Sequence, residues 1–151
     1  MMTQLFSKAA SDEKAASNEK AASDKTETTD KRWFRIVFFA IALLFNLCLV
    51  AQLLTVGLAV FSNGTWWQVH VWLVRGYAGL ALLLLIGALL IPFPNRVRAL
   101  ANGVVVLLAL QFITAHVHQP VQLGAVHPLL GFALFTTSTA LVHRTLPRPS
   151  T

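Results

Sequence analysis

Residues 34–61 read FRIVFFAIALLFNLCLVAQLLTVGLAVF, an apolar run with a single charged side chain, Arg35. This run exceeds the roughly 20 apolar residues that an α-helix needs to cross the core of a bilayer. Three further apolar runs follow, at about residues 69–91, 97–115 and 121–142. Backbone groups in lipid must be hydrogen-bonded within the protein, so these runs predict an all-α integral membrane protein with four spanning helices.

The composition supports a membrane domain. The chain is 56% hydrophobic and 12% charged, whereas soluble domains carry about 25% charged residues. All six acidic residues lie within residues 1–30, and from residue 33 onward the only charged side chains are six arginines. These arginines are scattered between apolar runs and form no basic face, so we expect a lipid bilayer as partner and no nucleic acid. The single cysteine, Cys48, excludes an intramolecular disulfide.

Residues 1–32 form a polar segment with a six-residue repeat that begins KAASDE at Lys8. Its charges balance and it has few large apolar side chains, so we expect a disordered tail, although its Ala, Lys and Glu content permits transient helix. It lacks the features of a signal peptide. We therefore divide the chain into this tail, a four-helix transmembrane domain at residues 33–146 and a short cytoplasmic tail at residues 147–151.

Among the ends and connections of the four apolar runs, lysine and arginine occur only on alternate ones. They flank the start of the first run, the turn at residues 92–98 and the end of the last run, at Lys31, Arg32, Arg35, Arg96, Arg98, Arg144 and Arg148. The other two connections contain neither residue type. By the positive-inside rule both termini are cytoplasmic, in a multi-pass protein of the plasma membrane. Short connections predict an antiparallel four-helix bundle.

Four of the five histidines fall on the predicted outer side: His70, His116, His118 and His127. Three of them lie in the stretch AHVHQPVQLGAVHPLLG at residues 115–131, and His143 lies alone on the other side. Imidazoles gathered at one depth of a membrane bundle indicate a metal or cofactor site. The alternative for any one of them is an interfacial histidine in contact with water.

The residue types missing from the outer side limit which metals or cofactors the site could bind. It has no thiolate and no carboxylate, which argues against the usual zinc sites, while an all-histidine copper or zinc site stays open. His116 and His118 are two residues apart and cannot share a helical face. A haem held by one histidine from each of two helices suits an antiparallel bundle better, with His70 and His127 facing each other.

The neighbours of these two histidines are compatible with a flat macrocycle. Gly131 leaves a gap one turn below His127, and Tyr77 lies below His70 on its face. Arg75 lies inside the second run with no acidic side chain to pair with. A buried guanidinium needs a counter-charge, which a haem propionate, a lipid phosphate or an anionic substrate would supply.

Two passages resemble one half of haem A synthase. QVHVWLVRGYAGL at residues 68–80 is similar to the second helix of such a half, and LQF at residues 110–112 with VHPLLG at residues 126–131 is similar to its third and fourth helices. The same His…Gln…His-Pro pattern resembles small uncharacterised four-helix membrane proteins. The resemblance implies haem ligands at His70 and His127, and a homodimer or larger membrane complex. The family's outer-loop glutamate is missing from residues 62–69. The resemblance therefore implies haem binding and leaves synthase activity open.

The sequence thus predicts a protein that binds haem b between its second and fourth helices at the outer face, for electron transfer or redox sensing. The cofactor-binding residues are His70, His127, Arg75, Tyr77 and Gly131, with His116 and His118 as secondary metal ligands. The alternatives are a haem-modifying enzyme acting as a dimer, a cofactor-free structural subunit and a transporter. The enzyme would need a carboxylate or water relay, and the transporter would need more polar groups at mid-membrane.

Overall fold

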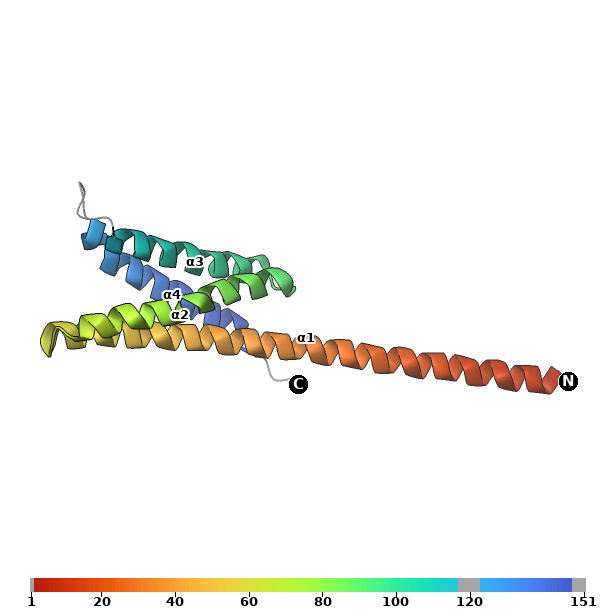
Figure 1. Ribbon diagram of the computed structural model, residues 1–151. Helices are drawn as coiled ribbons and strands as arrows, with labels where there is room; N and C mark the ends of the chain where they lie inside the picture. The colour runs from red at the N-terminus through yellow and green to blue at the C-terminus, as the bar shows by residue number, and fades with distance from the viewer. Residues whose placement is uncertain (1, 117–122, 148–151) are drawn as a thin grey trace. The chain divides into compact units, whose positions relative to one another are not determined.

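The computed structural model describes residues 2–116 and 123–147 of the chain. In chain order it has α1 (Met2–Phe61), α2 (Trp66–Leu90), α3 (Asn95–His116), a short 3₁₀ helix η1 (Leu123–Val126) and α4 (His127–Thr145), as Figure 1 shows. The described residues contain no strand, which confirms the all-α prediction. The chain divides into two compact units, residues 1–34 and residues 35–151, and each is described by itself.

The first unit has helical backbone from Met2 onward, as part of α1. Alanine, lysine and glutamate favour helix, which agrees with the helical backbone of the repeat segment. Isolated helices are marginal in water unless an apolar face is packed. The expectation that this segment does not fold stably by itself therefore stays a prediction.

The second unit is a four-helix bundle in which successive helices run in opposite directions (Figure 1). Helix α2 packs on α3, and α3 packs on α4. Helix α1 reaches α4 through Asn46, whose Nδ2 donates to Ser138 Oγ (3.2 Å) and Thr139 Oγ1 (2.9 Å). It reaches α2 through the edge-to-face pair of Phe45 and Tyr77, with ring centroids 5.5 Å apart. Each helix thus packs against its two neighbours around one core.

Small side chains let the helices approach closely, as is usual in membrane bundles. Ala42, Ala81, Ala88 and Ala101 are all buried in the core. At Gly87 a Cβ atom would lie 2.9 Å from the Phe38 ring, so this contact between α1 and α2 requires glycine.

Four stretches are long and apolar enough to cross a membrane: Arg32–Phe61, Trp66–Leu90, Asn95–His116 and Gly124–Thr145. Large apolar side chains are exposed on each of the four helices. So much exposed apolar surface would be unstable in water but suits contact with lipid. The chain is therefore a multi-pass membrane protein, as predicted.

The helix ends lie within about three residues of the apolar runs except at the start of α1, which extends back to Met2, and at the start of α4. Its first residue is His127, whereas the apolar run suggested a start near residue 121. Pro128 explains the later start, because proline is favoured in the first turn of a helix, where its missing N–H is not needed. The preceding residues 123–126 form the 3₁₀ helix. Residues 117–122 and residues 148–151 of the predicted C-terminal tail lie outside the described part.

Two arginines bond the turn between α2 and α3. Arg98 Nε donates to Ala88 O (3.2 Å), one of the last carbonyls of α2. Arg35 donates to Pro92 O (3.3 Å) and stacks over the Phe93 ring, 5.6 Å from its centroid. Carbonyls at a helix C-terminus lack partners within the helix, so these guanidinium groups stabilise the turn between α2 and α3.

Candidate functional site

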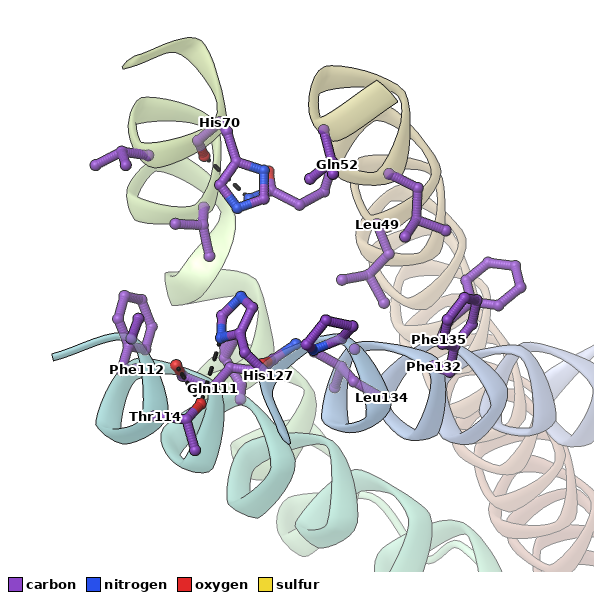
Figure 2. A pocket seen from close by; sticks show the side chains of 18 of the residues that line it. Leu49, Gln52, His70, Gln111, Phe112, Thr114, His127, Phe132, Leu134 and Phe135 are labelled. Carbon is purple, nitrogen blue, oxygen red and sulfur yellow. Dashed lines mark hydrogen bonds between the residues drawn. The ribbon is translucent and has the colours of Figure 1, made fainter. Parts of the chain in front are cut away.

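A cavity of about 880 Å³ opens at the end of the bundle where α1 and α3 end and α2 and α4 begin. Its size falls within the range of small-molecule and cofactor pockets. The lining is mainly apolar, with Leu49, Phe112, Leu134 and Phe135 among its residues. Figure 2 shows these side chains around the rings of His70 and His127, which come from different helices. The structure therefore brings the two predicted ligands to one cavity.

His70 is held by two residues of α1. Gln52 Nε2 donates to the His70 carbonyl oxygen (3.0 Å), and Thr55 Oγ1 lies 3.2 Å from His70 Nδ1. The Thr55 hydroxyl donates its single proton to Gln52 O (2.7 Å), so its oxygen accepts from Nδ1–H of the histidine. This assigns the tautomer in which Nε2 of His70 carries a lone pair. Trp67 makes an edge-to-face contact with the same ring, with centroids 5.8 Å apart.

His127 is held in a similar way by two residues of α3. Thr114 Oγ1 lies 3.3 Å from His127 Nδ1, while its hydroxyl donates to Leu110 O (2.9 Å) and Gln111 O (3.1 Å). The Gln111 amide fits with its nitrogen donating to His127 O (2.9 Å) and its oxygen accepting from Gly131 N–H (2.9 Å). In that orientation the amide nitrogen also lies 2.8 Å from His127 Nδ1. Protein groups therefore surround Nδ1, so a ligand can reach this ring only through Nε2. Because the amide nitrogen donates to Nδ1, the ring proton lies on Nε2 and must move to Nδ1 when a ligand binds.

Gly131 serves the protein rather than a ligand in this arrangement. A Cβ atom at residue 131 would lie 2.9 Å from the amide end of Gln111. Because residue 131 is glycine, the Gln111 amide can reach the backbone at the start of α4 and bond His127 O and Gly131 N–H. Gly131 also lines the cavity, as the sequence analysis expected of a gap below His127.

Arg75 and Tyr77 both line the cavity but differ in their surroundings. Arg75 is exposed, and its guanidinium lies over the Trp72 ring, 5.7 Å from the centroid. No carboxylate side chain occurs from residue 33 onward to neutralise it. Tyr77 is buried against Phe45, so packing accounts for its position.

The secondary candidates are less well placed for a metal. His116 lines the cavity, but its Nδ1 lies 2.7 Å from Phe112 O, to which it donates as the last turn of α3 ends. His118 lies outside the described residues. Within the described part, no group of three or more His, Cys, Asp or Glu side chains is placed to hold a metal ion. Two histidines alone suit a metal whose other coordination positions are filled by a cofactor.

Sequence reasoning missed the residues that hold the histidines. Gln52, Thr55 and Thr114 were not assigned a role, and Gln111 entered only as part of a motif. A signal was present, because a glutamine and a threonine three residues apart precede each of the two histidines. It was overlooked because the partners lie on the preceding helix, 13 to 18 residues away.

The fold and the cavity together define a multi-pass, all-α membrane protein with a histidine-lined site at one end of its bundle. Within the chain, residues 52–117 match a protein family of unknown function (DUF6220). No curated protein and no solved structure matches the chain. The matched segment contains Gln52, Thr55, His70, Gln111 and Thr114, and it ends before His127. None of these comparisons links the chain to haem A synthase.

Proposed function

We propose that the cavity binds b-type haem through His70 and His127, and that the protein serves electron transfer or redox sensing. The observation that supports this is the pair of imidazoles lining one apolar cavity, each held at Nδ1 by a threonine. Metal-bound histidines typically have their second ring nitrogen hydrogen-bonded in this manner. Iron in a porphyrin needs only axial protein ligands, so two histidines suffice.

The other residues at the site fit the same group. The apolar lining would cover the macrocycle, and Arg75 would balance the charge of a propionate at the rim. No aspartate, glutamate or cysteine lines the described part of the cavity. Bound haem would supply a one-electron redox centre. The protein's contribution would be to hold the axial ligands, exclude water and set the local charge.

The proposed orientation places both termini in the cytoplasm and the cavity at the outer face of the plasma membrane. It rests on the arginines at the opposite end of the bundle, Arg35, Arg96, Arg98 and Arg144, and on the absence of lysine and arginine from residues 62–68 and 116–127. An electron carrier in this position would exchange electrons with a partner at the outer surface.

Absorption spectra of the purified, detergent-solubilised protein test the proposal directly. Oxidised and reduced spectra of a low-spin haem with two imidazole ligands, together with one iron per chain, would support it. Protein that stays colourless after incubation with haem, and free of metal, would contradict it and favour a structural subunit. Copper or zinc without haem would point to the all-histidine metal site instead, and conversion of added haem would point to the enzyme.

A further inference from the structure

The two helical hairpins of the bundle, α1–α2 and α3–α4, share one register of buried residues. Phe38, Ala42, Phe45, Leu49 and Thr55 are buried in α1, and the five buried residues of α3 each lie 59 positions later: Val97, Ala101, Val104, Leu108 and Thr114. Ala59 is also buried in α1, and the position that corresponds to it, His118, lies outside the described residues. The four buried residues of α2 are likewise matched 57 positions later in α4: Tyr77 with Leu134, Ala81 with Ser138, Leu84 with Leu141 and Ala88 with Thr145.

The polar residues of the site follow the same two offsets. Gln52 and Thr55 correspond to Gln111 and Thr114 at 59 positions, and His70 corresponds to His127 at 57 positions. An apolar stripe is common to every packed bundle and would not by itself relate the two hairpins. Packing does not require a glutamine, a threonine and a histidine at matching positions. These polar residues are therefore the evidence that the two hairpins correspond.

Their contacts also correspond. In each hairpin the glutamine amide nitrogen donates to the main-chain oxygen of the histidine, at 3.0 Å for Gln52 and 2.9 Å for Gln111. In each hairpin the threonine oxygen lies near histidine Nδ1, at 3.2 Å for Thr55 and 3.3 Å for Thr114. Each threonine also donates to a carbonyl of its own helix. In both hairpins the glutamine therefore holds the backbone of the histidine and the threonine holds its ring, and in the second hairpin the Gln111 amide nitrogen also lies 2.8 Å from Nδ1.

From these correspondences we infer that the bundle contains the same histidine clamp twice, and that the two clamps present Nε2 of His70 and His127 to two sides of one ligand. The clamp consists of Gln52, Thr55 and His70 in the first hairpin, and of Gln111, Thr114 and His127 in the second. The glutamines and threonines are positioning residues, since they act through the histidines. The ligand class that suits two related clamps is a planar metal macrocycle with two open axial positions. This last step rests on the proposed haem function, whereas the clamp itself does not.

Replacing the threonines tests the clamp with and without haem. Thr55→Val and Thr114→Val keep the side-chain shape and remove the hydroxyl, whereas Thr55→Ser and Thr114→Ser keep the hydroxyl. Thr136→Val is the control, because Thr136 donates to carbonyls of its own helix, Phe132 O and Ala133 O, as the other two threonines do, but has no hydrogen bond to a histidine within the described residues. Helix content and elution volume of each variant would show that the bundle is folded.

Nitrogen-15 NMR of full-length, haem-free protein labelled at histidine gives the readout that does not depend on a ligand. We expect His70 to carry its proton on Nδ1 in the wild type, Thr55→Ser and Thr136→Val proteins. In Thr55→Val the preference for Nδ1–H should be lost. An unchanged His70 tautomer in folded Thr55→Val would overturn the clamp.

Haem titration of the same variants tests the shared ligand. Loss of a hydrogen-bond partner behind a metal ligand typically weakens binding about 10- to 100-fold. We expect a loss of that size in both valine variants, recovery in both serine variants, and no change in Thr136→Val. If the wild type binds no haem while the NMR result holds, the clamp stands and the haem function fails. If only one of the two valine variants affects haem binding, the equivalence of the clamps is wrong.

Discussion

The hairpins α1–α2 and α3–α4 have the same register of buried positions but fill them differently. The first places Phe38, Phe45 and Tyr77 where the second has Val97, Val104 and Leu134. Aromatic side chains in one hairpin are thus matched by smaller aliphatic ones in the other. The glutamine, threonine and histidine of the clamp are kept in type as well as in position. Packing therefore allows different apolar side chains at the same core position, whereas the site requires the same polar side chains in both hairpins.

The clamps themselves differ at one helical turn below the histidine. Gly131 in α4 corresponds to Val74 in α2. With glycine present, Gln111 bonds both His127 O and Gly131 N–H. In the first hairpin, Gln52 bonds His70 O through Nε2, and its Oε1 is buried without a partner in the described part of the chain. The first clamp therefore retains a free acceptor beside the cavity.

The two histidines consequently differ in how ready they are to bind a metal. At His70 the Thr55 oxygen lies 3.2 Å from Nδ1 and accepts from it, which assigns the lone pair to Nε2. At His127 the Gln111 amide nitrogen also lies 2.8 Å from Nδ1, and donation there places the ring proton on Nε2. Coordination by His127 then requires that proton to move to Nδ1, where the Thr114 oxygen accepts it. We expect His70 to be the first ligand and His127 the second.

The largest effect is expected in a topology experiment, because its outcome is all or none. If both hairpins start from the cytoplasm, a cysteine at Gly64 faces outward and a cysteine at Asn95 faces inward, in a Cys48→Ser background. An impermeant thiol reagent applied to intact cells should then label only residue 64. Labelling of residue 95 alone would place the cavity at the cytoplasmic side and remove the proposed exchange with an outer partner.

Removing the ligands should come next in size. We expect His70→Ala to abolish haem binding, since it removes the ligand with the free Nε2. His127→Ala should leave a weaker, five-coordinate complex held by His70, seen as a shift from low-spin to high-spin in the absorption spectrum. His143→Ala, in the last turn of α4 at the opposite end of the bundle, is the control and should bind as wild type. Equal loss in the two site variants would show that the histidines are not ranked.

Replacing the residue one turn below either histidine by alanine should have a moderate effect on the stability of the bundle. Gly131→Ala places a Cβ 2.9 Å from the amide of Gln111, so the amide must move away from His127 O and Gly131 N–H, and each lost hydrogen bond costs about 0.5–1.5 kcal/mol. Val74→Ala, at the corresponding position of α2, should destabilise the bundle less, because it only removes methyl groups from a half-buried side chain. Thermal unfolding in detergent measures both. Equal stability of Gly131→Ala and wild type would show that Gln111 does not need the space.

The rim of the cavity offers a smaller contrast, between Arg75 in α2 and Phe132 at the corresponding position of α4. Removing a cation near the haem should favour the oxidised state, so Arg75→Ala should lower the midpoint potential by tens of millivolts, where about 59 mV is tenfold for one electron. Arg75→Lys should retain most of the charge effect, and Phe132→Ala should change the potential less. The axial-ligand spectrum should stay the same in all three. A changed spin state in Arg75→Ala would mean that Arg75 positions a ligand instead.

The sequence predicted the membrane fold well because each helix is specified locally, by an apolar run of suitable length. It also brought His70 and His127 to one end of the bundle, since alternating helix directions follow from short connections. It did not predict the roles of Gln52 and Thr55, because hydrogen bonds between helices depend on how the helices rotate about their axes. Nor did it predict that α4 begins at His127, where a 3₁₀ turn replaces part of the expected helix.

The smallest effect is expected from the segment that precedes only the first hairpin. Residues 1–30 carry the repeat and all six carboxylates, and nothing comparable precedes α3. The charges of this segment nearly balance and it has few large apolar side chains, so it has little with which to stabilise a folded domain. Deleting residues 1–30 should therefore leave membrane insertion, the thermal unfolding midpoint and haem content unchanged. A deletion that keeps Lys31, Arg32 and Arg35 retains the positive charges proposed to orient the first helix. A truncated protein that unfolds at lower temperature or loses haem would show that the repeat stabilises the bundle, and the two hairpins would then differ in more than their side chains.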